Sequence, residues 1–353
     1  VRNRSNATAP LAPHPTRRAA LLAAVLAGLL LVGYTAYTGA QLINSWRQVE
    51  TQALDTGAVS AIGGSRAPTS QDDPDDVGTL EEGDEAPDST PSVTAPTEAY
   101  ETLLVIGSDE IAGAADVIVY LVRPTNGSDP FMVSLPRDLY VENPCTGGNS
   151  RINTLIKGCP ADDINGPTLL SSQVERITGI AVDHFVWFDF TGFENVVDAV
   201  GGVEICLDYP VRDAKAELDL PAGCTEATGA QALSWVRSRK TQQLVDGVWR
   251  SVPGASDFQR NEHQQEVIIQ LFSQLKTFDS PKQLTTKAAS LADNFVLDRG
   301  LSITEAVNLA WGLRSIDIDS IKRLELPVRL TRSTKGQSIV VLTASFDEVL
   351  RDA

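Results

Sequence analysis

Hydrophobic residues in the C-terminal two-thirds of the chain follow two alternating patterns. Short apolar runs, rich in β-branched residues and often ended by Gly or Pro, predict buried strands; they lie at 102–107, 116–124, 131–136, 183–190, 203–209, 321–328 and 337–342. Apolar positions spaced three or four apart predict helices; they lie at 166–180, 191–202, 229–240, 257–276, 280–294 and 302–313. Because strands are interleaved with helices, we expect one layered α/β domain over residues 99–353.

Several of these helices carry recognisable end signals. Gly179 stands where a left-handed C-cap would end the first helix, and Gly202 follows the second. Ser302 and Glu305 have the three-residue spacing of a capping box at the start of the last helix. These local signals agree with the helical spacing of the apolar residues.

The N-terminal region has the pattern of a membrane anchor. Residues 19–37 hold no charge, and at ~1.5 Å per residue such a helix reaches roughly 28 Å, about one hydrocarbon core. Arg17 and Arg18 precede the run, so the positive-inside rule places residues 1–18 in the cytoplasm and the C-terminal domain outside. The alternative is a cleaved signal peptide with small residues at 38–40. Both interpretations export the folded domain, and we expect a single-pass protein of the cell membrane.

Residues 38–98 predict an acidic, disordered tether. The part from 51 to 98 contains eleven Asp or Glu residues and only Arg66, and it is rich in Pro, Ser and Thr. Such a segment buries too little apolar surface to offset its chain entropy, and its like charges favour extended conformations. A functional acidic patch, for example one that binds calcium, is the alternative.

Charge and motifs exclude several classes of function. The chain has a net charge of −17 and its predicted folded part is also acidic, which argues against a nucleic-acid partner because such binding needs a basic face. With three His residues in the whole chain, a multi-His zinc site is excluded. The P-loop, the Rossmann glycine motif, the zincin motif and the serine-hydrolase elbow are all absent from the sequence.

The four cysteines, Cys145, Cys159, Cys206 and Cys224, all follow the predicted tether. Their spacing does not match a C-x-x-C motif, and an even number in an exported domain predicts two disulfides. Sequence order favours Cys145–Cys159 and Cys206–Cys224, which close short loops, although three pairings are possible. Free buried thiols are the alternative.

Candidate chemistry lies in polar residues at the ends of predicted elements: Asp109, Asp116, Arg137, Arg237, Arg239, Arg260 and Gln264. Two carboxylates at neighbouring strand ends suit Mg²⁺, whose remaining ligands are then water and substrate phosphate oxygens. Arginine forks bind phosphate oxygens bidentately. Each residue alone is as typical of a surface ion pair or a cap, but the combination predicts a pyrophosphate site without a Walker loop.

The sequence resembles the LytR–CpsA–Psr (LCP) family of bacterial envelope proteins. The motifs IGSDE, VSLPRDLYV, DAVGGVEICL, WVRSRK and DFQRNEHQQ occur in the family order within residues 101–275. The resemblance implies a three-layer α/β/α domain with a mixed central sheet and a long apolar pocket for a polyprenyl lipid. It also implies transfer of a glycopolymer phosphate from a polyprenyl-diphosphate carrier to peptidoglycan, with Mg²⁺ as cofactor and pyrophosphatase activity as a related reaction.

By motif position, the resemblance assigns roles to the same polar residues. The Mg²⁺ ligands would be Asp109 and Asp116; the diphosphate-binding residues would be Arg137, Arg237, Arg239, Arg260 and Gln264. The residues expected to act in catalysis are Asp109, as candidate general base, with Arg137, Arg237 and Arg239.

The chain departs from the family pattern at three arginine positions, now Ile111, Ala114 and His263, and segment 241–256 is longer than in the family. These departures favour the alternative function, a non-catalytic protein that binds polyprenyl phosphates or acts as a scaffold in the envelope. The retained acids and arginines favour the enzyme.

Overall fold

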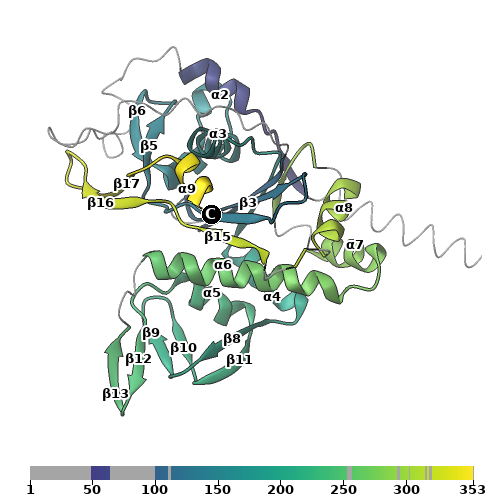
Figure 1. The fold of residues 1–353 in the computed structure, drawn as a ribbon, viewed down its shortest axis with the longest axis vertical. Helices are drawn as coiled ribbons and strands as arrows, with labels where there is room; N and C mark the ends of the chain where they lie inside the picture. Colours follow the sequence, from purple (N-terminus) through teal and green to yellow (C-terminus); the bar gives the residue numbers. More distant parts are fainter. Residues whose placement is uncertain are drawn as a thin grey trace, which may run out of the picture. The chain divides into compact units, whose positions relative to one another are not determined.

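The computed structural model describes residues 49–63, 100–109, 113–252, 257–291, 295–301, 303–314, 316–317 and 320–352 (Figure 1). The predicted cytoplasmic arm and membrane helix, residues 1–37, lie outside these ranges, as does most of the predicted tether. Among the helices in these ranges, none has both the length and the apolar character to cross a membrane.

A seven-stranded mixed sheet forms the centre of the described part of the chain. Its strands, in spatial order, are β1 (Glu50–Gln52), β14 (Val296–Asp298), β7 (His184–Asp189), β2 (Tyr100–Asp109), β3 (Ala114–Pro124), β4 (Phe131–Ser134) and β15 (Lys322–Leu324). The central strand β2 pairs antiparallel with β3 and parallel with β7. The predicted mixed α/β sheet is therefore confirmed.

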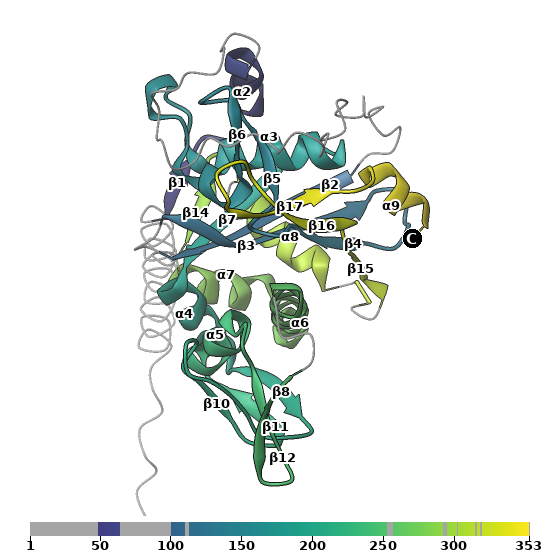
Figure 2. The same cartoon turned by 90° about the vertical axis from the view of Figure 1, so that its left-hand side faces the viewer.

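Alternating residues of the central strands face two different layers, as the period of two in a strand requires. Even-numbered residues such as Leu104, Ile106 and Tyr120 belong to the main core beneath α2 (Thr56–Gly63), η1 (Ile152–Lys157) and α3 (Gly166–Thr178). Odd-numbered residues such as Val105 and Val119 face α6 (Asp257–Gln274) on the other side. Figure 2 shows α2 and α3 above the sheet and α6 below it.

A small lobe extends beyond α6 on the side away from the sheet (Figure 1). It contains the helix α5 (Gly229–Arg237), which packs on α4 (Phe190–Val200). Its strands are β8 (Val203–Leu207), β9 (Val211–Asp213), β10 (Leu218–Leu220), β11 (Gly223–Ala227), β12 (Gln242–Val245) and β13 (Val248–Ser251). A separate hydrophobic cluster, which includes Val197, Ile205 and Trp235, holds the lobe together.

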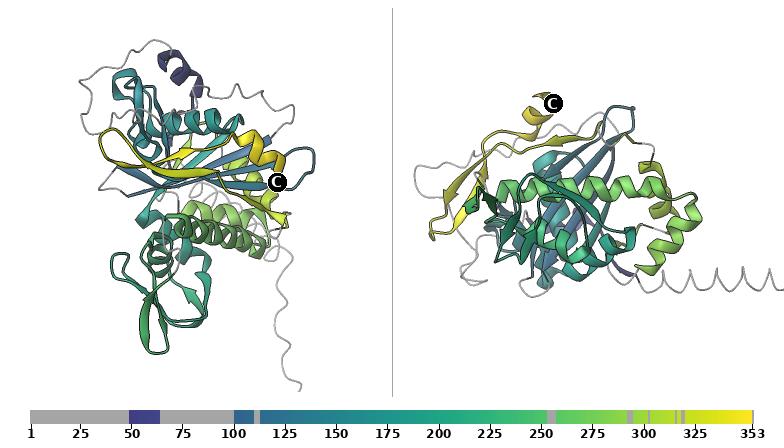
Figure 3. Two further views of the ribbon diagram at one scale, coloured as in Figure 1. Left: turned by 60° about the vertical axis from the view of Figure 1, so that its left-hand side comes forward. Right: turned by 90° about the horizontal axis from the view of Figure 1, so that it is seen from below.

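The remaining elements surround the sheet. They are β5 (Tyr140–Asn143), β6 (Gly148–Arg151), η2 (Pro160–Asp162), η3 (Leu275–Thr277), α7 (Pro281–Ser290), α8 (Ile303–Leu313), β16 (Val328–Arg332), β17 (Ser338–Leu342) and α9 (Phe346–Asp352). Figure 3 shows the C-terminal hairpin β16–β17, in yellow, with α9 on the α3 side of the sheet. Val340 and Phe346 join the main core there, so the C-terminal end of the chain is part of the packed domain.

Two expectations about local structure need correction. The predicted tether is wrong for residues 50–63, because β1 pairs in parallel with β14 and Val59 of α2 is buried in the main core. The predicted helix at 229–240 ends at Arg237, since the next residues are held in an extended turn. The Gly179 C-cap is confirmed, with φ of 70°, whereas Ser302 lies outside the described residues.

Both predicted disulfides, Cys145–Cys159 and Cys206–Cys224, are present. Cys159 is 2% exposed, whereas Cys206 and Cys224 are exposed and lie opposite each other in the antiparallel pair β8–β11. The first bridge fixes the loops beside the main core, and the second joins two strands of the lobe.

Candidate active site

A cavity of about 640 Å³ lies between the sheet, α4, α5 and α6. Its wall contains Asp116 and all five predicted diphosphate-binding residues: Arg137, Arg237, Arg239, Arg260 and Gln264. Lys215 and Lys240 bring the basic side chains to six, against the three acids Asp116, Asp189 and Asp213. Residues from six separate stretches of the sequence therefore form one pocket with an excess of positive charge.

A β-bulge turns Asp116 toward this cavity. The β2–β3 register pairs Gly107 with Val117 and then Ser108 with Ala115, so Asp116 is an extra residue without a partner on β2. Gly107 also lines the cavity, and a Cβ atom there would lie 3.1 Å from Val117 Cβ. The bulge and the glycine together open the end of the β2–β3 pair for the Asp116 side chain.

Arg137 follows β4 and forms an ion pair through Nη1 with the Asp116 carboxylate. Both side chains are a little over one-fifth exposed, 23% for Arg137 and 22% for Asp116, so solvent and ligands reach them. The ion pair places the residue that follows β4 directly beside Asp116. Asp109 is located differently, at the end of β2 opposite Ala114, and it is not among the residues that line the cavity.

A buried carboxylate orders the turn that carries the basic residues after α5. Asp213, 4% exposed, accepts hydrogen bonds from the backbone N–H groups of Lys215, Arg239 and Lys240 at 2.9–3.1 Å and from Ser238 Oγ at 2.9 Å. Burial alone would raise the pKa of Asp213, but these hydrogen bonds outweigh burial and lower it. The charged form of Asp213 therefore holds the turn at the cavity wall.

Arg237 is the last residue of α5, and its guanidinium lies 4.5 Å from the ring centre of Phe190 at the start of α4. Such cation–π contact orients a guanidinium without neutralising it. With the ordered turn at 238–240, this contact directs basic groups from α5 into the cavity.

Helix α6 supplies the opposite wall. Arg260, Gln264 and Ile268 are spaced four apart and line the cavity, with Arg260 and Gln264 only 3% and 4% exposed. Gln264 Nε2 donates to the backbone oxygen of Val236 at 3.4 Å, so its amide also connects α6 to α5. Gln264 thus combines a place in the cavity wall with a structural contact.

His263, at a position where the resemblance led us to expect an arginine, lines a different cavity on the other side of α6. Its ring stacks on Trp235 at 3.6 Å, and Nδ1 lies 3.2 Å from the Trp235 backbone oxygen. Burial lowers the pKa of His263 to about 4, although the backbone hydrogen bond opposes the change. The neutral imidazole is a packing group of the lobe.

An apolar layer continues from the charged cavity between the sheet and α6. Val117 and Ile268 line the cavity and pack in the same cluster as Val105, Val119 and Met132. At the far end of this cluster a small apolar pocket of about 50 Å³ is lined by residues that include Leu103, Leu121, Phe272, Leu309 and Ile321. A chain of apolar side chains therefore connects the charged cavity with an opening near α8.

The donor set is compatible with a magnesium ion that relies on substrate oxygens. Among the described residues, the one group of three candidate metal ligands at binding distance is Glu204 with the disulfide-bonded Cys206 and Cys224, away from the charged cavity. Asp116 can supply one carboxylate at the cavity, and Mg²⁺ commonly takes one or two protein carboxylates and completes its octahedron with water and phosphate oxygens. The residues present fit this kind of site.

Asp213, Lys215 and Lys240 also line the cavity, although they were not predicted as site residues. Lys240 directly follows the Arg-Ser-Arg motif, and a run of three cations in four residues is a usable signal. Asp213 is harder to detect, because its role depends on the backbone N–H groups of Arg239 and Lys240, which lie 26 and 27 positions away.

Known proteins resemble this chain over most of its folded part. A family model described as the LytR_cpsA_psr family matches residues 75–352. LcpB of Corynebacterium glutamicum, a probable cell wall biosynthesis protein, is 37% identical over 172 residues, which is 44% of this chain and 40% of the relative. TagU of Oceanobacillus iheyensis, a polyisoprenyl-teichoic acid–peptidoglycan teichoic acid transferase, is 28% identical over 194 residues, 54% of this chain and 55% of the relative.

Solved structures share the fold. The LytR-Csp2A-Psr enzyme from Actinomyces oris matches with a TM-score of 0.57 and 27% identity, covering 78% of this chain and 93% of that one. The chain spans about half the length of the curated relatives it matches, 40% to 55% for three of them. The family model covers most of the sequence, including every residue of the charged cavity. The chain therefore belongs to the LytR–CpsA–Psr family.

Proposed function

We propose that this protein transfers a glycopolymer phosphate from a polyprenyl-diphosphate carrier to peptidoglycan. The observation that carries the proposal is the junction of the basic cavity with the apolar layer under α6. A polyprenyl diphosphate has the matching chemistry, because its anionic head group is joined to a long apolar chain. The transferase names of the relatives support the same reaction class.

The basic residues would bind the diphosphate from two sides. Arg137 lies on the sheet side, while Arg237, Arg239 and Arg260 lie on α5, the following turn and α6. Planar guanidinium groups match pairs of phosphate oxygens, and their charge stabilises the charge that develops during phosphoryl transfer. In this arrangement the Asp116–Arg137 ion pair opens when a phosphate competes for Arg137.

Asp116 would hold Mg²⁺ at the cavity, with water and phosphate oxygens as its other ligands. The second predicted ligand, Asp109, ends β2 outside the cavity lining and would have to reach the ion from there. When bound, the ion would neutralise phosphate charge and orient the diphosphate. Asp109 remains our candidate for the general base that accepts the proton of the attacking hydroxyl.

The reaction is a displacement at the sugar-proximal phosphorus. The oxygen of a peptidoglycan hydroxyl forms a new bond to this phosphorus, its proton passes to the base, and the bridging P–O bond breaks. Polyprenyl monophosphate leaves with the bridging oxygen. If water replaces the hydroxyl, the same displacement gives pyrophosphatase activity. The carrier is a membrane lipid, so the proposal includes the membrane location predicted from residues 19–37.

The alternative is a non-catalytic protein that binds polyprenyl phosphate or acts as a scaffold. The specific observation that favours it is Ala114, which stands at the first position of β3 where the family has an arginine. A binding protein would need the cavity and the apolar layer but not the charge stabilisation of a transition state.

The test is release of lipid monophosphate from a polyprenyl-diphosphate sugar by the full chain, at several Mg²⁺ concentrations. We expect Arg137→Ala to lower the rate about 100- to 1,000-fold, by analogy with loss of one oxyanion donor. Arg137→Lys keeps the positive charge but loses the planar guanidinium, so its rate should lie between those of the wild type and Arg137→Ala. Asp116→Ala should raise the Mg²⁺ requirement, so that added metal partly restores turnover.

Arg176→Ala is the matched control, because Arg176 lies on α3, on the other side of the sheet, where it pairs with Glu142 of β5. It should retain full activity. Lipid retention without turnover by the wild type would favour the binding protein. Turnover of Arg137→Ala equal to the wild type would place the reaction elsewhere.

A further inference from the structure

Two lysines, Lys215 and Lys240, line the charged cavity from the side of the lobe. Lys215 lies in the turn between β9 and β10, and Lys240 lies in the turn that follows α5. Both residues are exposed, whereas Arg260 and Gln264 on the α6 wall are only 3% and 4% exposed. The cavity therefore has a buried wall at α6 and a solvent-exposed rim in the lobe, and we call Lys215 and Lys240 the rim lysines.

One buried carboxylate holds the backbone of both rim lysines. Asp213 accepts a hydrogen bond from the N–H of Lys215 through Oδ1 at 3.0 Å and from the N–H of Lys240 through Oδ2 at 2.9 Å. The N–H of Ala216 closes the first turn by donating to the backbone oxygen of Asp213 at 3.1 Å. Because two turns that are distant in sequence meet at one side chain, the two lysines extend from neighbouring points of the rim.

The ammonium groups of the rim lysines have no ion-pair or hydrogen-bond partner among the residues that the structure describes. In the same cavity, by contrast, Arg137 pairs with Asp116. Like charges that lie near one another without a counterion repel, and an anion placed between them relieves this repulsion. The rim lysines are therefore complementary to an anionic group of a ligand.

The cavity carries more positive charge than a diphosphate balances. Its six basic side chains exceed its three carboxylates by three. A diphosphate esterified at both ends carries about one negative charge per phosphorus. The predicted Mg²⁺ would add to the positive excess, because it is a divalent cation. One further anionic group would bring the charge of the filled cavity closer to balance.

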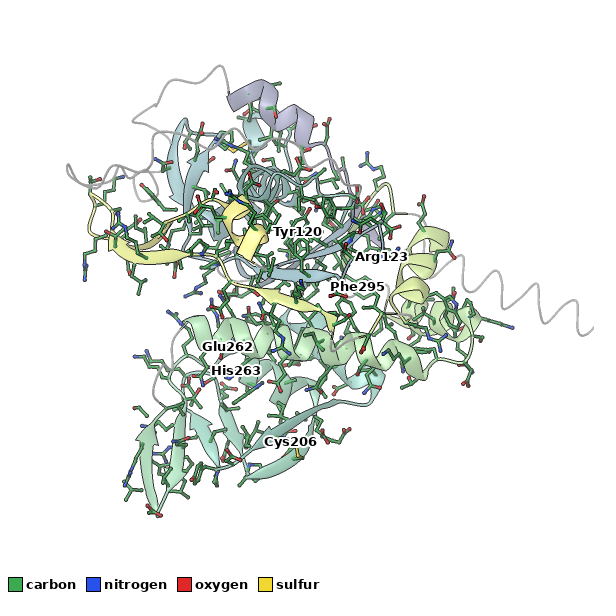
Figure 4. The ribbon with its side chains drawn as sticks, viewed as in Figure 1. Tyr120, Arg123, Cys206, Glu262, His263 and Phe295 are labelled. Carbon is green, nitrogen blue, oxygen red and sulfur yellow. A yellow bond between two sulfur atoms is a disulfide. The ribbon has the colours of Figure 1, made fainter. Side chains whose placement is uncertain are left out.

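The positive charge is confined to this side of α6. A second cavity, of about 590 Å³, lies on the other side of the helix, and its walls hold four carboxylates and one guanidinium, from Asp208, Glu262, Glu266, Glu325 and Arg323. In Figure 4, Glu262 and His263 are labelled on α6. The imidazole adds no positive charge at neutral pH, because burial lowers the pKa of His263 to about 4. An anion is therefore attracted to the first cavity and repelled from the second.

The stereochemistry of the proposed displacement places the acceptor on the lobe side of the first cavity. In an in-line transfer the attacking and leaving oxygens lie on opposite sides of the phosphorus. The leaving phosphate stays with the polyprenyl chain, whose apolar surroundings begin at Val117 and Ile268, between the sheet and α6. The attacking hydroxyl then arrives from the other side, where the rim lysines extend from the lobe.

We propose that Lys215 and Lys240 bind a carboxylate of the acceptor, so that the protein selects a glycan with an ionised peptide beside its reacting sugar. Peptidoglycan carries such groups, since its glycan bears short peptides with free carboxylates. Lysine suits this contact, because its ammonium is a point charge on a flexible stem and binds carboxylates in varied orientations. The assignment to the acceptor rests on the proposed function, whereas an anion site at the rim does not.

The test compares two soluble acceptors in calorimetric titrations of the full chain in detergent: a disaccharide-peptide fragment of peptidoglycan, and the same fragment with its carboxylates amidated. We expect the wild type to bind the ionised fragment about three- to tenfold more tightly, as two exposed ion pairs would give. Lys215→Met with Lys240→Met should bring the ratio close to one, whereas Lys215→Arg with Lys240→Arg should retain it. The preference should shrink at about 1 M salt, where the Debye length falls to about 3 Å.

Lys282→Met with Lys287→Met is the matched control, because it removes the same charge from α7, outside the residues that line the cavity. It should keep the wild-type ratio. In the transfer assay, the double methionine variant of the rim lysines should raise KM for the ionised acceptor more than KM for the amidated one.

Equal binding of the two fragments by the wild type, or an unchanged ratio in the methionine variant of the rim lysines, would overturn the proposal. Loss of a preference for a charged over a neutral donor lipid, with the acceptor preference intact, would assign the rim lysines to the donor and overturn it as well. Lipid monophosphate release is measured separately; its absence alongside the carboxylate preference would count against the transferase and not against the anion site.

Discussion

The Asp213 carboxylate accepts a hydrogen bond from the backbone N–H of Arg239 at 3.1 Å, across 26 positions of sequence. Oδ2 of this buried side chain accepts from Ser238, Arg239 and Lys240 and so determines the path of the turn that follows α5, while Oδ1 accepts from the Lys215 N–H. The basic side chains of this turn depend on a carboxylate that has no need to contact the substrate itself.

We predict that Asp213→Asn lowers lipid monophosphate release about 10- to 100-fold. The carboxylate has two acceptor oxygens, whereas the amide has one oxygen and an NH₂ group that would face backbone N–H donors. If the residue acts by positioning, the lost Arg237–Lys240 geometry should raise KM for the lipid substrate as well as lower kcat. Asp219→Asn on the exposed side of β10 is the control and should change neither. Normal kinetics for Asp213→Asn would show that the turn is held by other contacts.

The two disulfides should differ in their response to reductant. Cys206 and Cys224 are exposed, whereas Cys159 is 2% exposed. We expect mild reduction followed by thiol alkylation to label Cys206 and Cys224 first in a mass-spectrometric time course. Replacing the Cys145–Cys159 pair by alanines should lower the free energy of unfolding by about 3 kcal/mol in the chain-entropy model. Earlier labelling of Cys159 would contradict the order.

The His184–Asp298 pair should make stability depend on pH. His184 Nδ1 lies 3.0 Å from the buried Asp298, and this hydrogen bond raises the pKa of His184 above 6.5. The stabilisation is therefore fully present below pH 6.5 and is lost as the pH rises through the higher pKa of the folded state. We expect His184→Asn to lower the unfolding free energy by about 1–2 kcal/mol at pH 6 and by less at pH 9. Denaturant titrations at both pH values measure this; an equal loss at both would contradict it.

His263 should make the stability depend on pH in the opposite sense, with stability lost as the pH falls. Because burial lowers its pKa to about 4, the unfolded chain takes up a proton below pH 6.5 that the folded protein takes up only near pH 4. This group alone would destabilise the fold by on the order of 3 kcal/mol on acidification. His263→Phe keeps a ring stacked on Trp235 but cannot titrate, so its stability should fall less between pH 7 and pH 4. If the unfolding free energies of the variant and the wild type fall equally between pH 7 and pH 4, His263 would be protonated in the folded state as readily as in the unfolded chain.

The topology prediction rests on Arg17 and Arg18 ahead of the apolar run at 19–37. A reporter that is active only in the cytoplasm, fused after Ala353, should be silent. A reporter that requires export should be active at the same position. A strong signal from the cytoplasmic reporter would show that the C-terminal domain lies in the cytoplasm, where it could not reach a cell-wall substrate.

The sequence predicted the elements that are long or strongly patterned. Strands β2, β3 and β4 and helices α3 and α6 have apolar residues whose spacing matches their burial on one or two faces. The lobe strands β9 to β13 were missed because they are three to five residues long and largely exposed on one side. Strand β1 was missed because Glu50–Gln52 is polar and its pairing partner lies more than 240 residues away.

The site was predictable where it depends on motifs and not where it depends on long-range backbone contacts. Arg137, Arg239 and Arg260 were expected near one another, and all three line one cavity. His263 and Arg260 lie on the same helix but line different cavities. Helical spacing predicts this difference only once the buried face of α6 is known. The contribution of Asp213 required the fold.

The edge strand β1 has a practical consequence for making shorter forms of this protein. The family match begins at residue 75, so a fragment cut there would lack β1 and α2. Strand β14 would then have an unpaired edge, and the main core would lose Val59 as a cover. Open sheet edges recruit strands from other chains. Such a fragment should aggregate on expression, whereas one that starts before Val49 should remain monodisperse.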